Sequence, residues 1–145
     1  MPITVKKIQL WRKEVENRPG SLASTLEPLA SKGANFQVVM AYRYPGNQKK
    51  AAIELSPVTG RKLVSAAETA GLTVSPIPTL LVEGDNRPGV GHAIAQAITE
   101  ANINVDFLVA QAIGRRYSAV IGFENEEDTK TAATLIKKSM ARKRK

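Results

Sequence analysis

Two copies of the tetrapeptide Asn-Arg-Pro-Gly are the residues of this sequence best suited to binding chemistry. Each follows an apolar, strand-like run and precedes a run with helical spacing, so each is expected to lead from a strand into the start of a helix. The first turn of a helix leaves backbone N–H groups without intrahelical acceptors, and the helix dipole favours negative charge there. A carboxylate or phosphate could therefore bind at either turn. The two copies comprise Asn17, Arg18, Pro19 and Gly20, and Asn86, Arg87, Pro88 and Gly89.

Neighbouring residues extend this candidate site. The glycines allow a ligand to approach the backbone closely. The amide of Asn17 or Asn86 could meet the other end of a small zwitterion, and Asn35 and Asn104 could close the site if the start of the second strand lies near the turn. The ligand-binding residues expected from the sequence are Asn17, Arg18, Pro19, Gly20, Asn35, Asn86, Arg87, Pro88, Gly89, Val90, Gly91 and Asn104. The same residue types also build turns and helix caps that bind nothing, so a purely structural turn is the competing interpretation.

The second turn is the better candidate on sequence grounds. Gly91 stands where the first copy has Leu22, and the smaller residue is expected to leave space for a ligand. The second turn is no Walker A loop, however, because Val90-Gly91 occupies the place of the required Lys-Ser/Thr pair.

Several function classes lack the residues that they need. The chain has no cysteine and one histidine, His92, which argues against disulfides, zinc–thiolate sites and thiol nucleophiles. No pattern of serine, histidine and aspartate indicates a catalytic triad. We therefore expect neither a metal nor a cofactor, and no enzymatic activity.

The net charge of +8 raises the alternative of a nucleic-acid partner. Four of the positive charges belong to the last four residues, Arg142 to Lys145, which we interpret as a solvated helix end. Nucleic-acid binding is therefore not expected. A hydrophobic content of 43% suits a packed core, and no run resembles a signal peptide or a membrane span. The sequence predicts a soluble, cytoplasmic protein.

The tetrapeptides belong to a longer repeat with an offset of 69 residues, which also places Asn35 on Asn104. Each copy predicts the order strand, helix, strand, strand, helix. The predicted elements of the first copy are strands at 8–15, 35–44 and 51–55, with apolar helical stripes around Leu26 and Leu63. Those of the second are strands at 79–83, 104–112 and 117–123, with stripes around Ile94 and Leu135.

The last strand of each copy sets the domain boundaries. The first copy continues into a strand at 72–75, whereas the second runs from its helix into the basic tail. Residues 3–5 (ITV) align with residues 72–74 (LTV), so we expect residues 3–6 to complete the sheet of the second domain, either in the same chain or in a partner copy. The predicted domains are 1–76, apart from that strand, and 77–145, with a basic tail from 141.

The two blocks NRPGSLASTLEPLASKGAN and NRPGVGHAIAQAITEANIN resemble the most recognisable part of the ACT domain family. The resemblance covers nearly the whole chain as two tandem copies. It implies an α+β fold of two βαββαβ, ferredoxin-like units with antiparallel sheets and helices on one face. It also implies a regulatory module that binds small molecules, often amino acids, at paired domain interfaces.

The expected function is therefore a non-enzymatic sensor that binds an amino acid at the Asn-Arg-Pro-Gly turns and passes the signal to a regulated enzyme or regulator protein, with a homodimer as the expected assembly. The alternative is a protein- or nucleic-acid-interaction module that acts through its basic surface and tail.

Overall fold

The computed structural model describes residues 3–142, without the side chains of residues 141 and 142, and divides the chain into two compact units. The first unit is Gln9–Pro76. The second is the chain from Ile77 onward together with the N-terminal strand. Within the described residues, no helix is long and apolar enough to cross a membrane.

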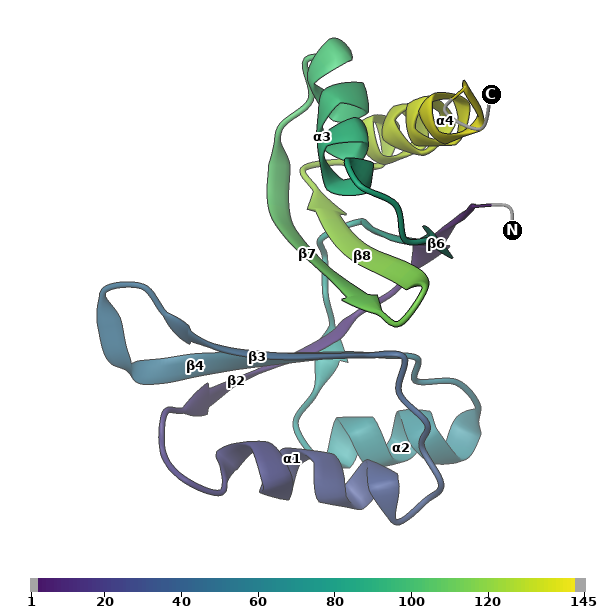
Figure 1. Ribbon diagram of the computed structural model, residues 1–145. Helices are drawn as coiled ribbons and strands as arrows, with labels where there is room; N and C mark the ends of the chain where they lie inside the picture. Colours follow the sequence, from purple (N-terminus) through teal and green to yellow (C-terminus); the bar gives the residue numbers. More distant parts are fainter. Residues whose placement is uncertain (1–2, 143–145) are drawn as a thin grey trace. The chain divides into compact units, whose positions relative to one another are not determined.

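The first unit is an antiparallel sheet with two helices on one face (Figure 1). Its strands lie in the order β3-β4-β2-β5, so the two middle strands are β4 and β2. Its core forms between the helices and the sheet, and includes Trp11, Leu29, Ile53 and Leu55. The elements are β2 (Trp11–Glu16), α1 (Ser21–Ala30), β3 (Val38–Tyr44), β4 (Asn47–Ser56), α2 (Arg61–Thr69) and β5 (Thr73–Val74).

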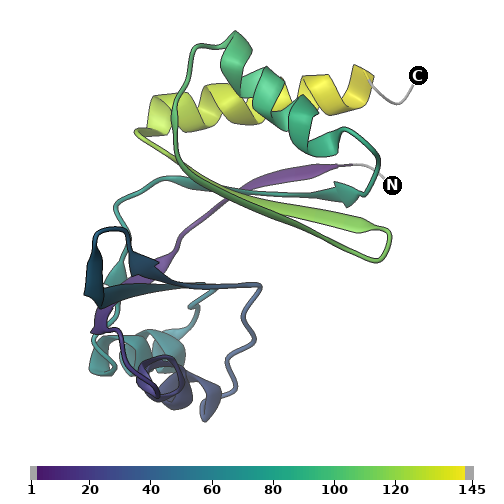
Figure 2. The same cartoon turned by 60° about the vertical axis from the view of Figure 1, so that its left-hand side comes forward.

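The second unit repeats this plan, with the strand order β1-β6-β8-β7. Both of its helices cover the same face of the sheet (Figure 2). Its fourth strand is β1 from the start of the chain, which pairs antiparallel with β6 and places Val5 opposite Val82. The elements are β1 (Thr4–Ile8), β6 (Thr79–Asp85), α3 (Val90–Glu100), β7 (Val105–Ile113), β8 (Arg116–Phe123) and α4 (Glu126–Arg142).

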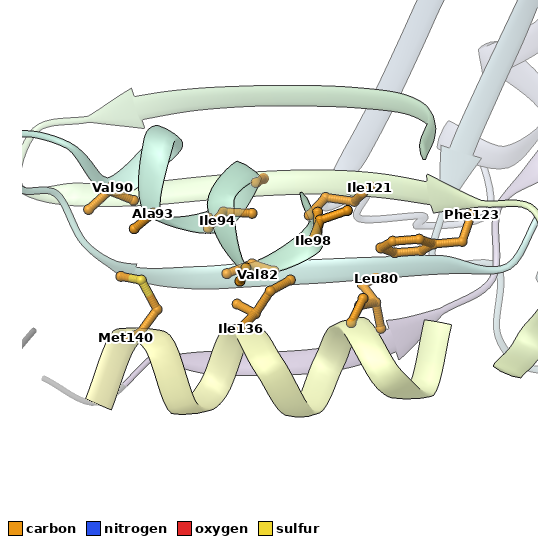
Figure 3. Packing of buried hydrophobic residues seen from close by; sticks show 13 residues of the cluster. Leu80, Val82, Val90, Ala93, Ile94, Ile98, Ile121, Phe123, Ile136 and Met140 are labelled. Carbon is orange, nitrogen blue, oxygen red and sulfur yellow. The ribbon is translucent and has the colours of Figure 1, made fainter. Parts of the chain in front are cut away.

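The core of the second unit is built from alternate residues of two strands. Leu80 and Val82 on β6, and Ile121 and Phe123 on β8, are two residues apart and point to one face of the sheet (Figure 3). Ile94 from α3 is among the helix side chains that meet them. Each such side chain is fully buried or nearly so, which contributes roughly 1.5–3 kcal/mol of transfer free energy per residue.

The α+β fold class, with two βαββαβ units and helices on one face, is confirmed. The first predicted strand, 8–15, was wrong in its extent because it spans a boundary between units. Ile8 ends β1 in the sheet of the second unit, whereas Trp11 begins β2 in the sheet of the first. An apolar run indicates that strands are present, but it does not show to which sheet each half belongs.

Candidate functional site

Both Asn-Arg-Pro-Gly segments form the turn from the first strand of their unit into its first helix. Gly20 has φ of 92° and Gly89 has φ of 84°, and each directly precedes the first residue of a helix. A left-handed backbone at this point strains any residue with a β-carbon, which explains the glycine after each proline. Neither helix has a side-chain cap, so the asparagines do not serve as helix caps.

The absence of side-chain caps leaves backbone donors at the start of α1. Ser21 N–H donates to Arg18 O and Ser24 N–H donates to Gly20 O. Among the described residues, the N–H groups of Gly20, Leu22 and Ala23 have no acceptor. In the turn before α3, the N–H groups of Gly89, Gly91 and His92 likewise have no acceptor among the described residues. Both turns therefore offer the donors that an anion needs.

The asparagine and arginine of the first turn are held by their neighbours. Asn17 N–H donates to Lys49 O at 2.9 Å, and Asn17 Nδ2 donates to Gln48 O at 2.7 Å. These two bonds fix the turn to β4 and leave Asn17 Oδ1 as an acceptor. Arg18 lies 3.7 Å from the carboxylate of Glu16, and both groups are exposed.

The second turn is fixed in an equivalent way. Asn86 N–H donates to Arg115 O at 2.7 Å, which matches the bond of Asn17 to Lys49. Arg87 contributes to a small cavity beneath the turn, together with Val90. Pro88 and Val90 also border a shallower hollow of about 120 Å³ beside Met140.

Asn35 and Asn104 are not brought to the turn of their own unit. The second strand of each unit runs parallel to the first, because both are antiparallel to the third. Strand β3 therefore begins at the end of the sheet where β2 begins (Figure 1). Its first residue, Val38, is separated from the turn after Glu16 by roughly 20 Å of strand. Asn35 precedes this end and Asn104 precedes the matching end of β7. The expected closure of the site by these asparagines does not occur within a unit.

The space expected around Gly91 is filled by another strand. A β-carbon on Gly91 would lie 3.4 Å from Tyr117 Oη, so the tyrosine hydroxyl occupies the region that Leu22 faces in the first copy. Ile3 covers Gly84 in the same way, at 3.3 Å from the position of a β-carbon. The remaining cavity is about 10 Å³, which is room for one water molecule at most. Burial raises the pKa of Tyr117, so its hydroxyl stays protonated near neutral pH.

The first turn has the opposite arrangement of large and small residues. Val15, Leu22 and Ala51 occupy the places of Gly84, Gly91 and Tyr117, as the repeat and the strand registers show. Leu22 is 40% exposed and does not close the site. A hollow of about 180 Å³ therefore lies beside the turn, lined on the turn side by Asn17, Arg18, Ser21 and Leu22 and on the sheet side by Ala41, Arg43 and Ala51. We call it the first-turn hollow.

A buried carboxylate on the first sheet was missed by the sequence analysis. Glu54 is 1% exposed, and Tyr42 Oη donates a hydrogen bond of 2.8 Å to its Oε2. Burial, followed by this bond, raises the pKa of Tyr42 to about 12. Glu54 is the strand partner of Arg12, whose guanidinium donates to Tyr44 Oη. These side chains lie on the sheet face opposite the helices, and of the four residues Tyr42 also borders the first-turn hollow.

His92 lies in a different hollow, of about 240 Å³, between α3 and α4. Glu100 and Lys138 border it as well. Over the residues that the structure describes, no group of three or more acidic or histidine side chains could hold a metal ion. Residues 143–145 of the basic tail lie outside the described residues.

Comparisons with known proteins give the fold an experimental counterpart. No protein-family model and no curated protein sequence matches this chain. Among solved structures, protein BT0572 from Bacteroides thetaiotaomicron superimposes with a TM-score of 0.71 and 16% identity, over 91% of this chain and 88% of its own. The regulatory subunit of aspartate kinase from Thermus thermophilus, in a ligand-free form, gives 0.66 and 16%, over 96% and 97%.

The corresponding subunit from Thermus flavus gives a TM-score of 0.63 at 15% identity, over 97% of both chains. At such identities the likeness shows the fold. The two-unit architecture expected from the ACT resemblance is thus found in chains of the same extent.

Proposed function

We propose that this chain is a non-catalytic regulatory protein that binds an amino acid in the first-turn hollow. The observation that carries the proposal is the combination of free backbone donors and space at one turn. The N–H groups of Gly20, Leu22 and Ala23 have no acceptor within the described residues, and Leu22 is among the residues that line the hollow of about 180 Å³. That volume is more than ten times the roughly 10–15 Å³ that one water molecule needs on the same measure, so the hollow has room for a small molecule.

The chemistry of the hollow suits a zwitterion. The carboxylate of the ligand accepts hydrogen bonds from the free N–H groups at the positive end of the α1 dipole. The ammonium donates to Asn17 Oδ1, because Asn17 borders the hollow and this oxygen is left as an acceptor. The second turn has the same donors but is filled by Ile3 and Tyr117, so we assign it a structural role.

The fold supports a regulatory role. Two solved structures with this architecture are regulatory subunits of aspartate kinases, and this chain covers 97% of each. We infer that this chain, too, acts on a partner enzyme or regulator protein. Ligand binding would change the relative stability of two conformations of the first unit, and the partner would bind one of them more tightly.

Self-association is the second part of the proposal. Strand β7 is an edge strand of nine residues with exposed apolar side chains, including Val109 at 50% and Ile113 at 68%. A long apolar edge offers free backbone groups to another strand. A homodimer through this edge predicts that Ile113→Lys shifts the mass measured by light scattering toward the monomer, whereas the exposed control Glu127→Lys on α4 leaves it unchanged.

Calorimetric titration and thermal-shift measurements with the common amino acids test the binding proposal. A ligand that binds only the folded state at one hundred times its Kd stabilises that state by about 2.7 kcal/mol. Leu22→Trp fills the hollow and should weaken binding about tenfold or more, whereas Ala30→Trp, exposed at the far end of the same helix, should leave binding intact. Removal of residues 142–145 should also leave binding intact. The absence of binding by every amino acid would refute the proposal.

A further inference from the structure

The two units differ in one charged side chain beside the turn, and this difference bears on the class of ligand. Arg43 on β3 pairs with Ala51, which pairs in turn with Val15 on β2. In the second unit the equivalent row across the three strands is Ala112 on β7, Tyr117 on β8 and Gly84 on β6. Arg18 has its counterpart in Arg87, but Arg43 corresponds to an alanine. The first-turn hollow therefore carries one more cation than the equivalent place in the second unit.

Arg43 faces the hollow. Directly paired residues of antiparallel strands share a face of the sheet, and Val15, at the far end of this row, packs against the core between sheet and helices. Arg43 is thus on the helix side and lines the hollow with Arg18. Among residues 3–142, the Arg43 side chain has no ion-pair or hydrogen-bond partner.

The other charges around the hollow are already balanced. Glu16 is paired with Arg18 at 3.7 Å. Glu14 and Lys50 lie 3.8 Å apart, on the row of residues that faces away from the helices. Arg43 is therefore the surplus charge. A zwitterion with a neutral side chain leaves it without a counter-ion, and a basic side chain is repelled by it.

We propose that the first-turn hollow selects amino acids with a negatively charged side chain, and that Arg43 binds that side-chain carboxylate. This inference rests on the proposed function, because it names the ligand class of the same site. The planar guanidinium binds carboxylates through paired hydrogen bonds, which are stronger than those between neutral groups. An uncharged amide side chain of the same shape accepts fewer such bonds and carries no charge. The expected preference for the acid over its amide is about tenfold or more.

The test compares glutamate with glutamine and aspartate with asparagine by calorimetric titration at physiological ionic strength, using the full chain. The unmodified protein should bind each acid about tenfold or more tightly than its amide. Arg43→Gln should weaken the binding of the acids to the level of the amides, and Arg43→Lys should restore part of the preference. Lys49→Gln removes the same charge from the same hairpin, at an exposed position that does not line the hollow, and should leave the preference intact.

The possible outcomes separate this inference from the proposed function. Equal affinity of the unmodified protein for the acids and their amides would overturn the role of Arg43 but leave an amino-acid sensor in place. Failure of every amino acid to bind would overturn both. Inorganic phosphate is the control for unspecific attraction of anions: binding of phosphate as tight as that of glutamate would overturn the selection of acidic amino acids. Circular dichroism of Arg43→Gln checks that the exposed substitution leaves the fold intact.

Discussion

Any residue larger than glycine at position 122 on β8 should lower the stability of the protein, because the Phe107 ring lies over this position. A β-carbon at Gly122 would lie 2.2 Å from Phe107 Cε1 and 2.6 Å from its Cδ1. Carbon atoms in contact are normally about 3.5–4.0 Å apart, so the ring would have to move by more than 1 Å. Displacing a packed side chain in this way costs about 1–3 kcal/mol. Alanine instead of glycine in a strand contributes about 0.5–1 kcal/mol in the other direction. Gly122→Ala should therefore lower the free energy of unfolding by about 1–2 kcal/mol.

A double-mutant cycle makes this reasoning refutable, because the sign of the effect should change. In a Phe107→Ala background the three atoms nearest to the new β-carbon are absent, so Gly122→Ala should raise the free energy of unfolding by about 0.5–1 kcal/mol. Urea denaturation followed by circular dichroism measures each corner of the cycle. Ser118→Ala on the same strand is the control and should have a small effect. If Gly122→Ala costs the same with and without the Phe107 ring, the contact is not what requires glycine.

Three further predictions concern the second unit and the tyrosine of the first sheet. Gly91→Ala should stabilise the protein by about 0.5–1 kcal/mol in urea denaturation, because alanine favours helix and its β-carbon would meet Tyr117 Oη at an ordinary contact distance of 3.4 Å. A loss of stability would show that the contact with the Tyr117 hydroxyl is repulsive. Val5→Asp should cost about 1–3 kcal/mol, because Val5 packs against the core of the second unit, whereas Lys6→Asp on the outer row should be close to neutral. Tyr42 has its pKa raised to about 12 in the folded state, so its contribution to stability is present below pH 10 and is lost as the pH rises from about 10 to about 12; Tyr42→Phe should flatten the stability profile in that window, and an unchanged profile would contradict the shift.

The amino-acid sequence by itself determined the order of elements and the position of both turns. Strand and helix follow from hydrophobic periodicity over short windows, and the left-handed glycine after each proline follows from local backbone sterics. The offset of 69 residues then gave two copies of one plan. These are local properties, or comparisons of local properties, which explains why the fold class could be predicted.

The tertiary structure decided what each turn can hold. Tyr117 fills the space beside Gly91, and Ile3 covers Gly84, although each pair is distant in the chain. The start of β3, after Asn35, lies at the far end of the sheet from the first turn because the pairing with β4 sets its direction. Packing and strand pairing are properties of residues brought together by folding, and no local pattern encodes which side chain will reach a given gap. The sequence thus located two equivalent turns, and only the packing around them left a hollow of about 180 Å³ beside the first and filled the region around Gly84 and Gly91 in the second.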